Sequence, residues 1–80
     1  MIKLLYFARL RETLGTDGEQ LDSTPATVAD LLDHLKRRGD PWEDALSGKI
    51  LVAVNQEMAL PETQLHDGDE LGLFPPVTGG

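Results

Sequence analysis

The sequence contains no cysteine among its 80 residues. This absence excludes a disulfide scaffold, a zinc–thiolate site and a catalytic cysteine. It also excludes a cysteine persulfide, so any sulfur that the chain handles has to be held on another group. A chain of this length forms one domain at most and has little room for an enclosed active site beside its core.

Basic residues are also scarce: seven Lys and Arg stand against 14 Asp and Glu, which gives a net charge of −7. This balance argues against nucleic-acid binding, and it fits docking on basic partner surfaces and a general solubility role equally well. The sequence has no apolar run near the roughly 20 residues of a membrane span and no signal-peptide cleavage site. We therefore expect no nucleic-acid or membrane partner and a cytoplasmic location.

One amphipathic stretch predicts the main helix over residues 28–38, because apolar residues recur at i, i+3, i+4 and i+7 from Val28. Thr27 is its expected N-cap, and Gly39 follows its end. A helix of about two turns is predicted over residues 8–14 with a stop at Gly15, and a helical turn over 40–46. Apolar runs and turn residues predict strands over 2–7, 19–23, 50–54, 58–60 and 71–74, the first of them buried.

This order of elements predicts an α+β domain with the main helix across one face of a mixed, four- to five-stranded sheet. It resembles the order of the β-grasp, or ubiquitin-like, fold, in which the first and last strands are parallel neighbours. We place the globular domain at residues 1–74. Because proline cannot donate a ladder hydrogen bond, Pro75 and Pro76 end the last strand, and residues 75–80 are predicted to form a flexible tail.

The tail ends in Gly79-Gly80, and glycine lets such an end enter a narrow channel. Six extended residues reach roughly 20 Å at about 3.3 Å each, enough to bring the terminal carboxylate into a partner's enclosed site. The natural route to a reactive carboxylate is adenylation by an ATP-using partner. Later attack by sulfur gives a thiocarboxylate, and attack by a thiol or amine gives a thioester or an isopeptide; the residues leave these outcomes open.

Several segments along the whole chain resemble the small, sulfur-carrier subunit of molybdopterin synthase. They are residues 6–12 with Gly15, residues 54–56, residues 67–70 and the end of the chain, residues 74–80. The sequence Phe-Pro-Pro-Val before the terminal glycines is the most specific of them. The stretch over residues 8–14 also favours this branch over the more compact thiamine carriers.

The resemblance implies that a ubiquitin-activating-enzyme-like adenylyltransferase activates Gly80 with ATP, and that a sulfur donor system converts it to a thiocarboxylate. The tail with Gly79 and Gly80 would then enter the large subunit of molybdopterin synthase, where the sulfur attacks cyclic pyranopterin monophosphate. The assembly would be a heterotetramer. The chain itself would be a sulfur-donating subunit that binds no cofactor or metal directly and performs no catalysis alone.

Phe7 and Phe74 end the first and last strands, so parallel pairing would bring both rings near the exit of the tail. They are either two core rings or part of an exposed docking patch. The resemblance adds Met58 to that patch, and Arg11 is predicted either to bind a partner or to form a surface ion pair. The predicted partner-binding set is completed by the tail residues Pro75, Pro76, Val77 and Thr78.

Other features are weaker. His66 beside Asp67 and Asp69 indicates an ordinary turn rather than a metal site. Trp42 is expected to anchor the core or its edge. Three other functions remain as alternatives: a ubiquitin-like modifier of protein lysines, a sulfur carrier for thiamine or tRNA thiolation, and an inert ubiquitin-like interaction module.

Overall fold

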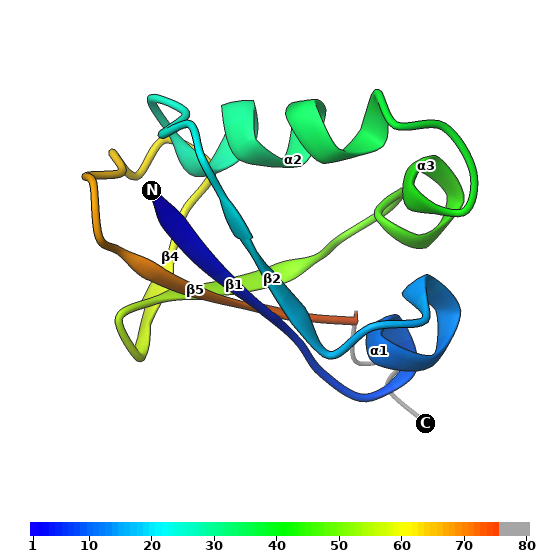
Figure 1. Cartoon of the computed structure of the whole chain (residues 1–80). Coiled ribbons are helices and arrows are strands. Elements are labelled where there is room, and N and C mark those ends of the chain that lie inside the picture. Colours follow the sequence, from blue (N-terminus) through cyan, green and yellow to red (C-terminus); the bar gives the residue numbers. More distant parts are fainter. Residues whose placement is uncertain (76–80) are drawn as a thin grey trace.

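The computed structural model describes residues 1–75, and residues 76–80 lie outside the described part of the chain. Within residues 1–75 it contains five strands and three helices (Figure 1). In chain order they are β1 (Ile2–Tyr6), α1 (Arg9–Leu14), β2 (Gly18–Leu21), α2 (Val28–Lys36), α3 (Trp42–Ala45), β3 (Leu51–Val54), β4 (Glu57–Ala59) and β5 (Glu70–Phe74).

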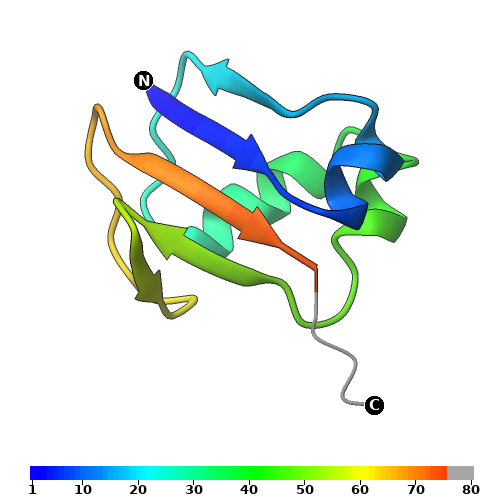
Figure 2. The same cartoon turned by 90° about the horizontal axis from the view of Figure 1, so that it is seen from below.

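The five strands form one sheet in the order β2-β1-β5-β3-β4. β1 and β5 pair in parallel, and the other neighbouring pairs are antiparallel. α2 crosses one face of this sheet. Figure 2 views the sheet from its other face, so that α2 lies behind the strands. This arrangement is the predicted α+β architecture, with the first and last strands as parallel neighbours.

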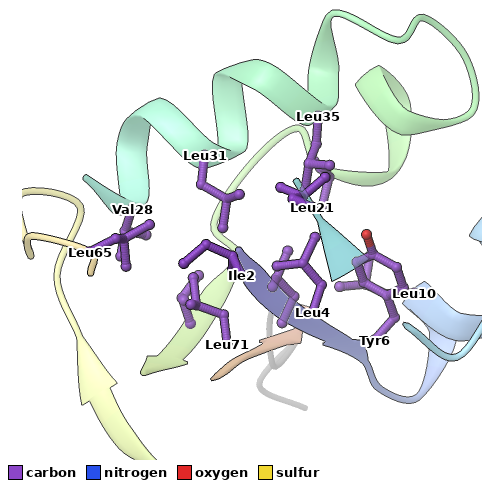
Figure 3. Close-up of a cluster of buried hydrophobic side chains, with 13 residues drawn as sticks. Ile2, Leu4, Tyr6, Leu10, Leu21, Val28, Leu31, Leu35, Leu65 and Leu71 are labelled. Carbon is purple, nitrogen blue, oxygen red and sulfur yellow. The ribbon is translucent and has the colours of Figure 1, made fainter. Parts of the chain in front are cut away.

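The core lies between α2 and the sheet (Figure 3). Alternate residues of β1 and β5 point toward the helix, and its apolar stripe covers them, as the spacing from Val28 predicts. The buried core is entirely apolar apart from the hydroxyl of Tyr6. Its most deeply buried members are Ile2, Leu4, Tyr6, Val28, Leu31, Leu35, Leu46, Leu71 and Leu73.

The ends of the helices follow the predicted signals closely. Thr27 is the N-cap of α2, where its hydroxyl accepts a hydrogen bond from the backbone N–H of Asp30 at 3.2 Å. α2 ends at Lys36, two residues before the predicted end, and the chain turns with Gly39 at φ +87°. α1 ends at Leu14, and Gly15 after it has the left-handed conformation expected of a helix stop.

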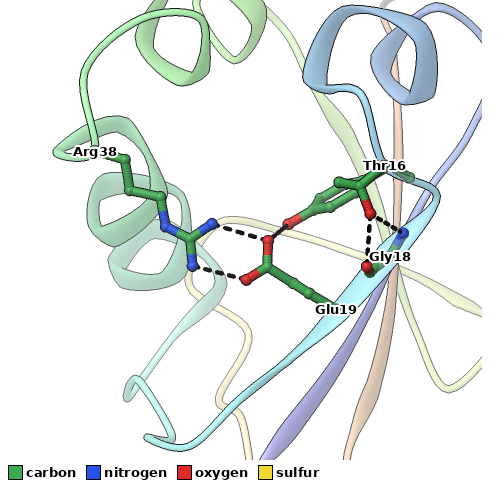
Figure 4. A network of polar contacts seen from close by, with 5 residues as sticks. Thr16, Gly18, Glu19 and Arg38 are labelled. Atoms are coloured by element: carbon green, nitrogen blue, oxygen red, sulfur yellow. Dashed lines mark hydrogen bonds and ion pairs between the residues drawn. The ribbon is translucent and has the colours of Figure 1, made fainter.

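A compact polar network ties β1, β2, the end of α2 and α3 together (Figure 4). The Glu19 carboxylate accepts two hydrogen bonds from the Arg38 guanidinium and one from the Tyr6 hydroxyl, each at 2.8 Å. The Arg38 bonds are the main cause that lowers the pKa of Glu19, while burial raises the pKa of Tyr6. The Arg38 guanidinium carbon also lies 4.5 Å from the centroid of the Trp42 ring. Trp42 is partly buried and packs against the core, which confirms its predicted place as an anchor at the edge of the core.

Candidate docking site

The face of the sheet opposite α2 carries an apolar patch that the described helices leave uncovered. Successive side chains of a strand point to opposite faces, so Leu5 and Phe7 point away from the core that Leu4 and Tyr6 join. The first strand, which was predicted to be buried, is therefore buried on one face only. We use the name apolar patch for Leu5, Phe7, Leu51, Ala53, Met58, Gly72 and Phe74.

The centre of the apolar patch is a stacked pair of phenylalanine rings. Phe7 and Phe74 follow the parallel register of β1 and β5, and the backbone N–H of Phe7 donates to the carbonyl of Leu73 at 3.1 Å. Their ring centroids lie 4.6 Å apart, and the ring planes differ by 6°. Neither ring belongs to the buried core, and Phe7 is 36% exposed. The expected closeness of the two rings is confirmed, and they form a surface stack rather than two core rings.

Gly72 lies beneath this stack on β5. A Cβ atom at this position would lie 3.0 Å from a ring carbon of Phe7 and 3.3 Å from a ring carbon of Phe74. The first distance is shorter than an ordinary van der Waals contact. The missing side chain therefore lets both rings lie flat against the sheet.

The rest of the apolar patch runs across the sheet toward its β4 edge. Leu51 lies opposite Phe74, while Ala53 lies between Gly72 on one side and Met58 on the other. Residues directly opposite one another share a face, so Met58 stands on the same face as the phenylalanine stack. Met58 is 68% exposed and Leu51 39%. Leu51 and Met58 therefore continue the apolar patch with exposed side chains.

The phenylalanine stack lies beside the point where the described chain ends, at Pro75. α1 and α3 lie together beyond the ends of β1 and β5 (Figures 1 and 2). Between them is a cavity of about 450 Å³ with Pro75 at its edge. Its other lining residues are Ala8, Arg9, Leu10 and Thr13 from the first helical segment and Asp44, Ala45 and Ser47 from the second.

The remaining predicted site residues are placed as follows. Arg11 is exposed on α1, outside the apolar patch, and forms no ion pair with the residues that the structure describes. Pro75 is half-buried. The other tail positions fall outside residues 1–75, so their predicted roles remain predictions: they are Pro76, Val77, Thr78, Gly79 and Gly80.

The turn around His66 is organised by hydrogen bonds. The Asp69 carboxylate accepts the backbone N–H of His66 at 2.8 Å and the side-chain amide of Asn55 at 2.9 Å. These bonds, that of His66 first, lower the pKa of Asp69. Over residues 1–75, no three His, Cys, Asp or Glu side chains gather in a group that could hold a metal ion. None of the helices in that range is long and apolar enough to cross a membrane.

The family model of the ThiS family matches residues 4–80. The chain belongs to the ThiS family. Its relatives include the molybdopterin synthase sulfur carrier subunit of Haemophilus influenzae, which is 46% identical over 81 residues that cover 100% of both chains.

Two solved structures of similar proteins have the same fold as this chain. The putative molybdopterin converting factor, subunit 1, from Pyrococcus furiosus is 32% identical with a TM-score of 0.79, over 95% of this chain and 97% of that one. The small archaeal modifier protein 1 of Haloferax volcanii is 35% identical with a TM-score of 0.69, over the same shares of the two chains. The predicted β-grasp fold and the predicted resemblance to sulfur-carrier subunits are thereby confirmed.

The sequence reasoning missed four members of the apolar patch. Leu5 and Gly72 stand two residues before Phe7 and Phe74, so the period of a strand would have found both. Leu51 and Ala53 carried no such signal, because their place beside the stack depends on the register between β3 and β5. In the structure, these four residues join the two predicted aromatic residues and Met58 into one continuous apolar patch.

Proposed function

We propose that this chain carries sulfur for molybdenum cofactor (molybdopterin) biosynthesis on its C-terminal Gly80, in the cytoplasm. The observation that carries the proposal is the match along the whole chain to a molybdopterin synthase sulfur carrier subunit. An apolar patch beside the exit of the tail supports it, because a carrier that inserts its tail into a partner needs a docking surface at the base of that tail.

The proposed chemistry takes place at the terminal carboxylate. An oxygen of Gly80 attacks the α-phosphorus of ATP on an adenylyltransferase, which forms an acyl-adenylate and releases pyrophosphate. A hydrosulfide equivalent from the sulfur donor system then attacks the carbonyl carbon, and AMP leaves as the thiocarboxylate forms. In the large subunit of molybdopterin synthase, the thiocarboxylate sulfur attacks a carbon of cyclic pyranopterin monophosphate, and a C–O bond at that carbon breaks with the oxygen as leaving group. Hydrolysis of the resulting acyl–sulfur bond leaves the sulfur on the substrate and restores the carboxylate.

The chain contributes position rather than catalytic groups to these steps. The apolar patch would dock first on the adenylyltransferase and then on the large subunit, with the stack of Phe7 and Phe74 near its centre. Buried aromatic side chains at the centre of an interface supply most of its affinity. Met58 would extend the contact toward the β4 edge, and Arg11 would contact the partner beside the tail. One patch serves one partner at a time, so the carrier has to leave the first enzyme before it meets the second.

A second candidate function is conjugation to protein lysines, and the likeness to the small archaeal modifier protein 1 favours it. It uses the same activated Gly80, with a lysine amine in place of sulfur as the nucleophile, and yields an isopeptide. A sulfur carrier for thiamine or tRNA thiolation would form the same thiocarboxylate and differ in the acceptor. The two classes are therefore separated by the product formed at the C-terminus.

Intact-mass measurement tests this proposal. The chain is incubated with its adenylyltransferase, ATP and a sulfur source, and the expected product has one oxygen exchanged for sulfur. The purified thiocarboxylate should then convert cyclic pyranopterin monophosphate when the large subunit is added. A variant without Gly80 is the control, since it keeps the apolar patch and lacks the reacting group. Lysine conjugates without any thiocarboxylate would overturn sulfur carriage and establish the modifier function.

A further inference from the structure

The connection between β1 and α1 is a tight turn with an unusual residue in it. The backbone N–H of Leu10 donates to the carbonyl of Phe7 at 3.2 Å, which closes a four-residue turn. Ala8, its second residue, has φ +53° and ψ −130°. These angles are those of a type II′ turn, whose second position is dominated by glycine because a Cβ atom is strained there.

The chain uses glycine for most of its other positive-φ positions, namely Gly15, Gly39, Gly48 and Gly68. The remaining two within residues 1–75 are Asn55 and Gln56, which form the two-residue turn between β3 and β4. Ala8 is therefore an exception at a position where glycine would be free of strain.

Packing inside the domain does not explain the alanine. Ala8 is exposed, it lies outside the buried core, and it lines the cavity that Pro75 borders. The methyl group thus adds strain without filling a core position. Strained residues that persist without such a packing role gather at binding and catalytic sites.

The residues on either side of Ala8 indicate which part of the molecule the turn positions. Phe7, directly before it, is one half of the ring stack at the centre of the apolar patch. Arg9, directly after it, begins α1. The hydrogen bonds from Leu10 to Phe7 and from Phe7 to Leu73 hold the turn in place. Within the turn, an alanine leaves a narrower range of φ and ψ than a glycine would, so it limits the backbone motion that would carry the Phe7 ring away from Phe74 and Gly72.

We propose that Ala8 is a positioning residue for partner docking, which holds the Phe7 ring flat in the apolar patch at the expense of stability. The inference rests on the proposed function, because the benefit is realised when a partner docks on the patch. A ring that is already held in place loses less conformational freedom on binding. The strained turn thereby lowers the stability of the free protein and raises its affinity for the partner.

The test is Ala8→Gly, for which stability and affinity should change in opposite directions. We expect the Tm to rise by a few degrees, since the strain is relieved. We expect the Kd for the large subunit of molybdopterin synthase to rise about fivefold, which corresponds to about 1 kcal/mol. In the free protein, NMR relaxation of the Phe7 ring should show increased motion. Ala8→Ser keeps a Cβ atom and should retain the Kd and the ring order of the original chain.

Gly39→Ala is the matched control. It places an alanine at φ +87° after α2, away from the apolar patch, and its Cβ would meet no atom within 4 Å. This variant should lower the Tm and leave the Kd unchanged.

The outcomes separate the two proposals. A wild-type chain that does not bind the large subunit contradicts the proposed function, while the ring dynamics of the free protein still test Ala8. If Ala8→Gly binds as tightly as the wild type, or its Phe7 ring is as ordered, the positioning role is overturned. A lower Tm for Ala8→Gly would overturn the argument from strain.

Discussion

Tyr6 and Phe7 are neighbours in the chain, yet they lie on opposite faces of the sheet: Tyr6 belongs to the core and Phe7 to the apolar patch. Tyr6 is 1% exposed and packs beneath α2, where its hydroxyl donates to Glu19. Phe7 is 36% exposed and stacks on Phe74 on the uncovered face. Both faces are apolar, so composition alone does not tell them apart. The comparison shows that one short sheet separates the face that stabilises the domain from the face that we propose to bind partners. Substitutions on one face should therefore leave the function of the other face unchanged.

The largest effect is expected on the helix-covered face. Leu71→Ala removes a fully buried side chain from β5. The free energy of unfolding should fall by about 3 kcal/mol, because the variant loses apolar burial and leaves a cavity. Urea titration followed by circular dichroism measures this loss. The fraction that remains folded should bind the large subunit with an unchanged Kd, and a weaker Kd for it would contradict the separation of the two faces.

On the uncovered face, Phe74→Ser should have the opposite profile. The Kd for each partner should rise about thirtyfold, or about 2 kcal/mol, since an aromatic side chain at the centre of an interface is lost. The free energy of unfolding should change by less than this, because the ring is only half-buried. Calorimetric titration and urea titration measure the two quantities. A variant that unfolds, or that binds both partners normally, contradicts the docking role.

A smaller effect is expected from a substitution of Gly72, which lies beneath the stack of Phe7 and Phe74. Gly72→Ala introduces a Cβ atom 3.0 Å from the Phe7 ring and 3.3 Å from the Phe74 ring, so at least one ring has to tilt away from the sheet. We expect a Kd about tenfold higher and a loss of about 1 kcal/mol in the free energy of unfolding. Chemical shifts of the two rings would report the tilt. Unchanged shifts with an unchanged Kd would mean that the stack is not needed for docking.

The smallest effect concerns the polar network at Glu19. Hydrogen bonds from Arg38 and Tyr6 lower the pKa of this carboxyl below its ordinary value of 4.5. As the pH falls, the unfolded chain takes up this proton before the folded chain does, so the stabilisation that Glu19 contributes is present above its ordinary pKa of 4.5 and is lost as the pH falls below it. Glu19→Gln should lower the free energy of unfolding by about 1 kcal/mol at pH 7 and give a shallower acid dependence. An unchanged acid dependence would contradict this role for Glu19.

Much of the fold was predictable from local patterns. The spacing from Val28 predicted α2 and its buried stripe, and the Thr27 cap and the Gly15 stop are both observed. The resemblance of the element order to the β-grasp fold also implied that β1 and β5 would be parallel neighbours, and they are. These features depend on residues close together in the sequence, or on a topology that few alternatives satisfy.

The rest depended on contacts between distant segments. From Leu4 to Phe7 the run is apolar without alternation, so its pattern did not show which face the helix leaves uncovered, although the period of a strand places Leu5 on the same face as Phe7. Glu19 and Arg38 are 19 positions apart, and their pairing requires the end of α2 to fold over β2. Of the apolar patch, the sequence predicted the two aromatic residues, and the family resemblance added Met58. That Gly72 lies beneath both rings depends on the register of β1 and β5, and the strain at Ala8 depends on its backbone angles.

The parallel pairing of β1 and β5 also has a mechanical consequence. β5 is the central strand of the sheet, with β1 on one side and β3 on the other. The described chain ends at Pro75, directly after this strand. A pull on the C-terminus would therefore load two ladders of hydrogen bonds in shear, since these bonds run across the strand, and would not peel an edge strand bond by bond. A partner that grips the tail would pull on a strand that is hydrogen-bonded on both sides, so we expect the tail to slide out of the partner before the domain unfolds.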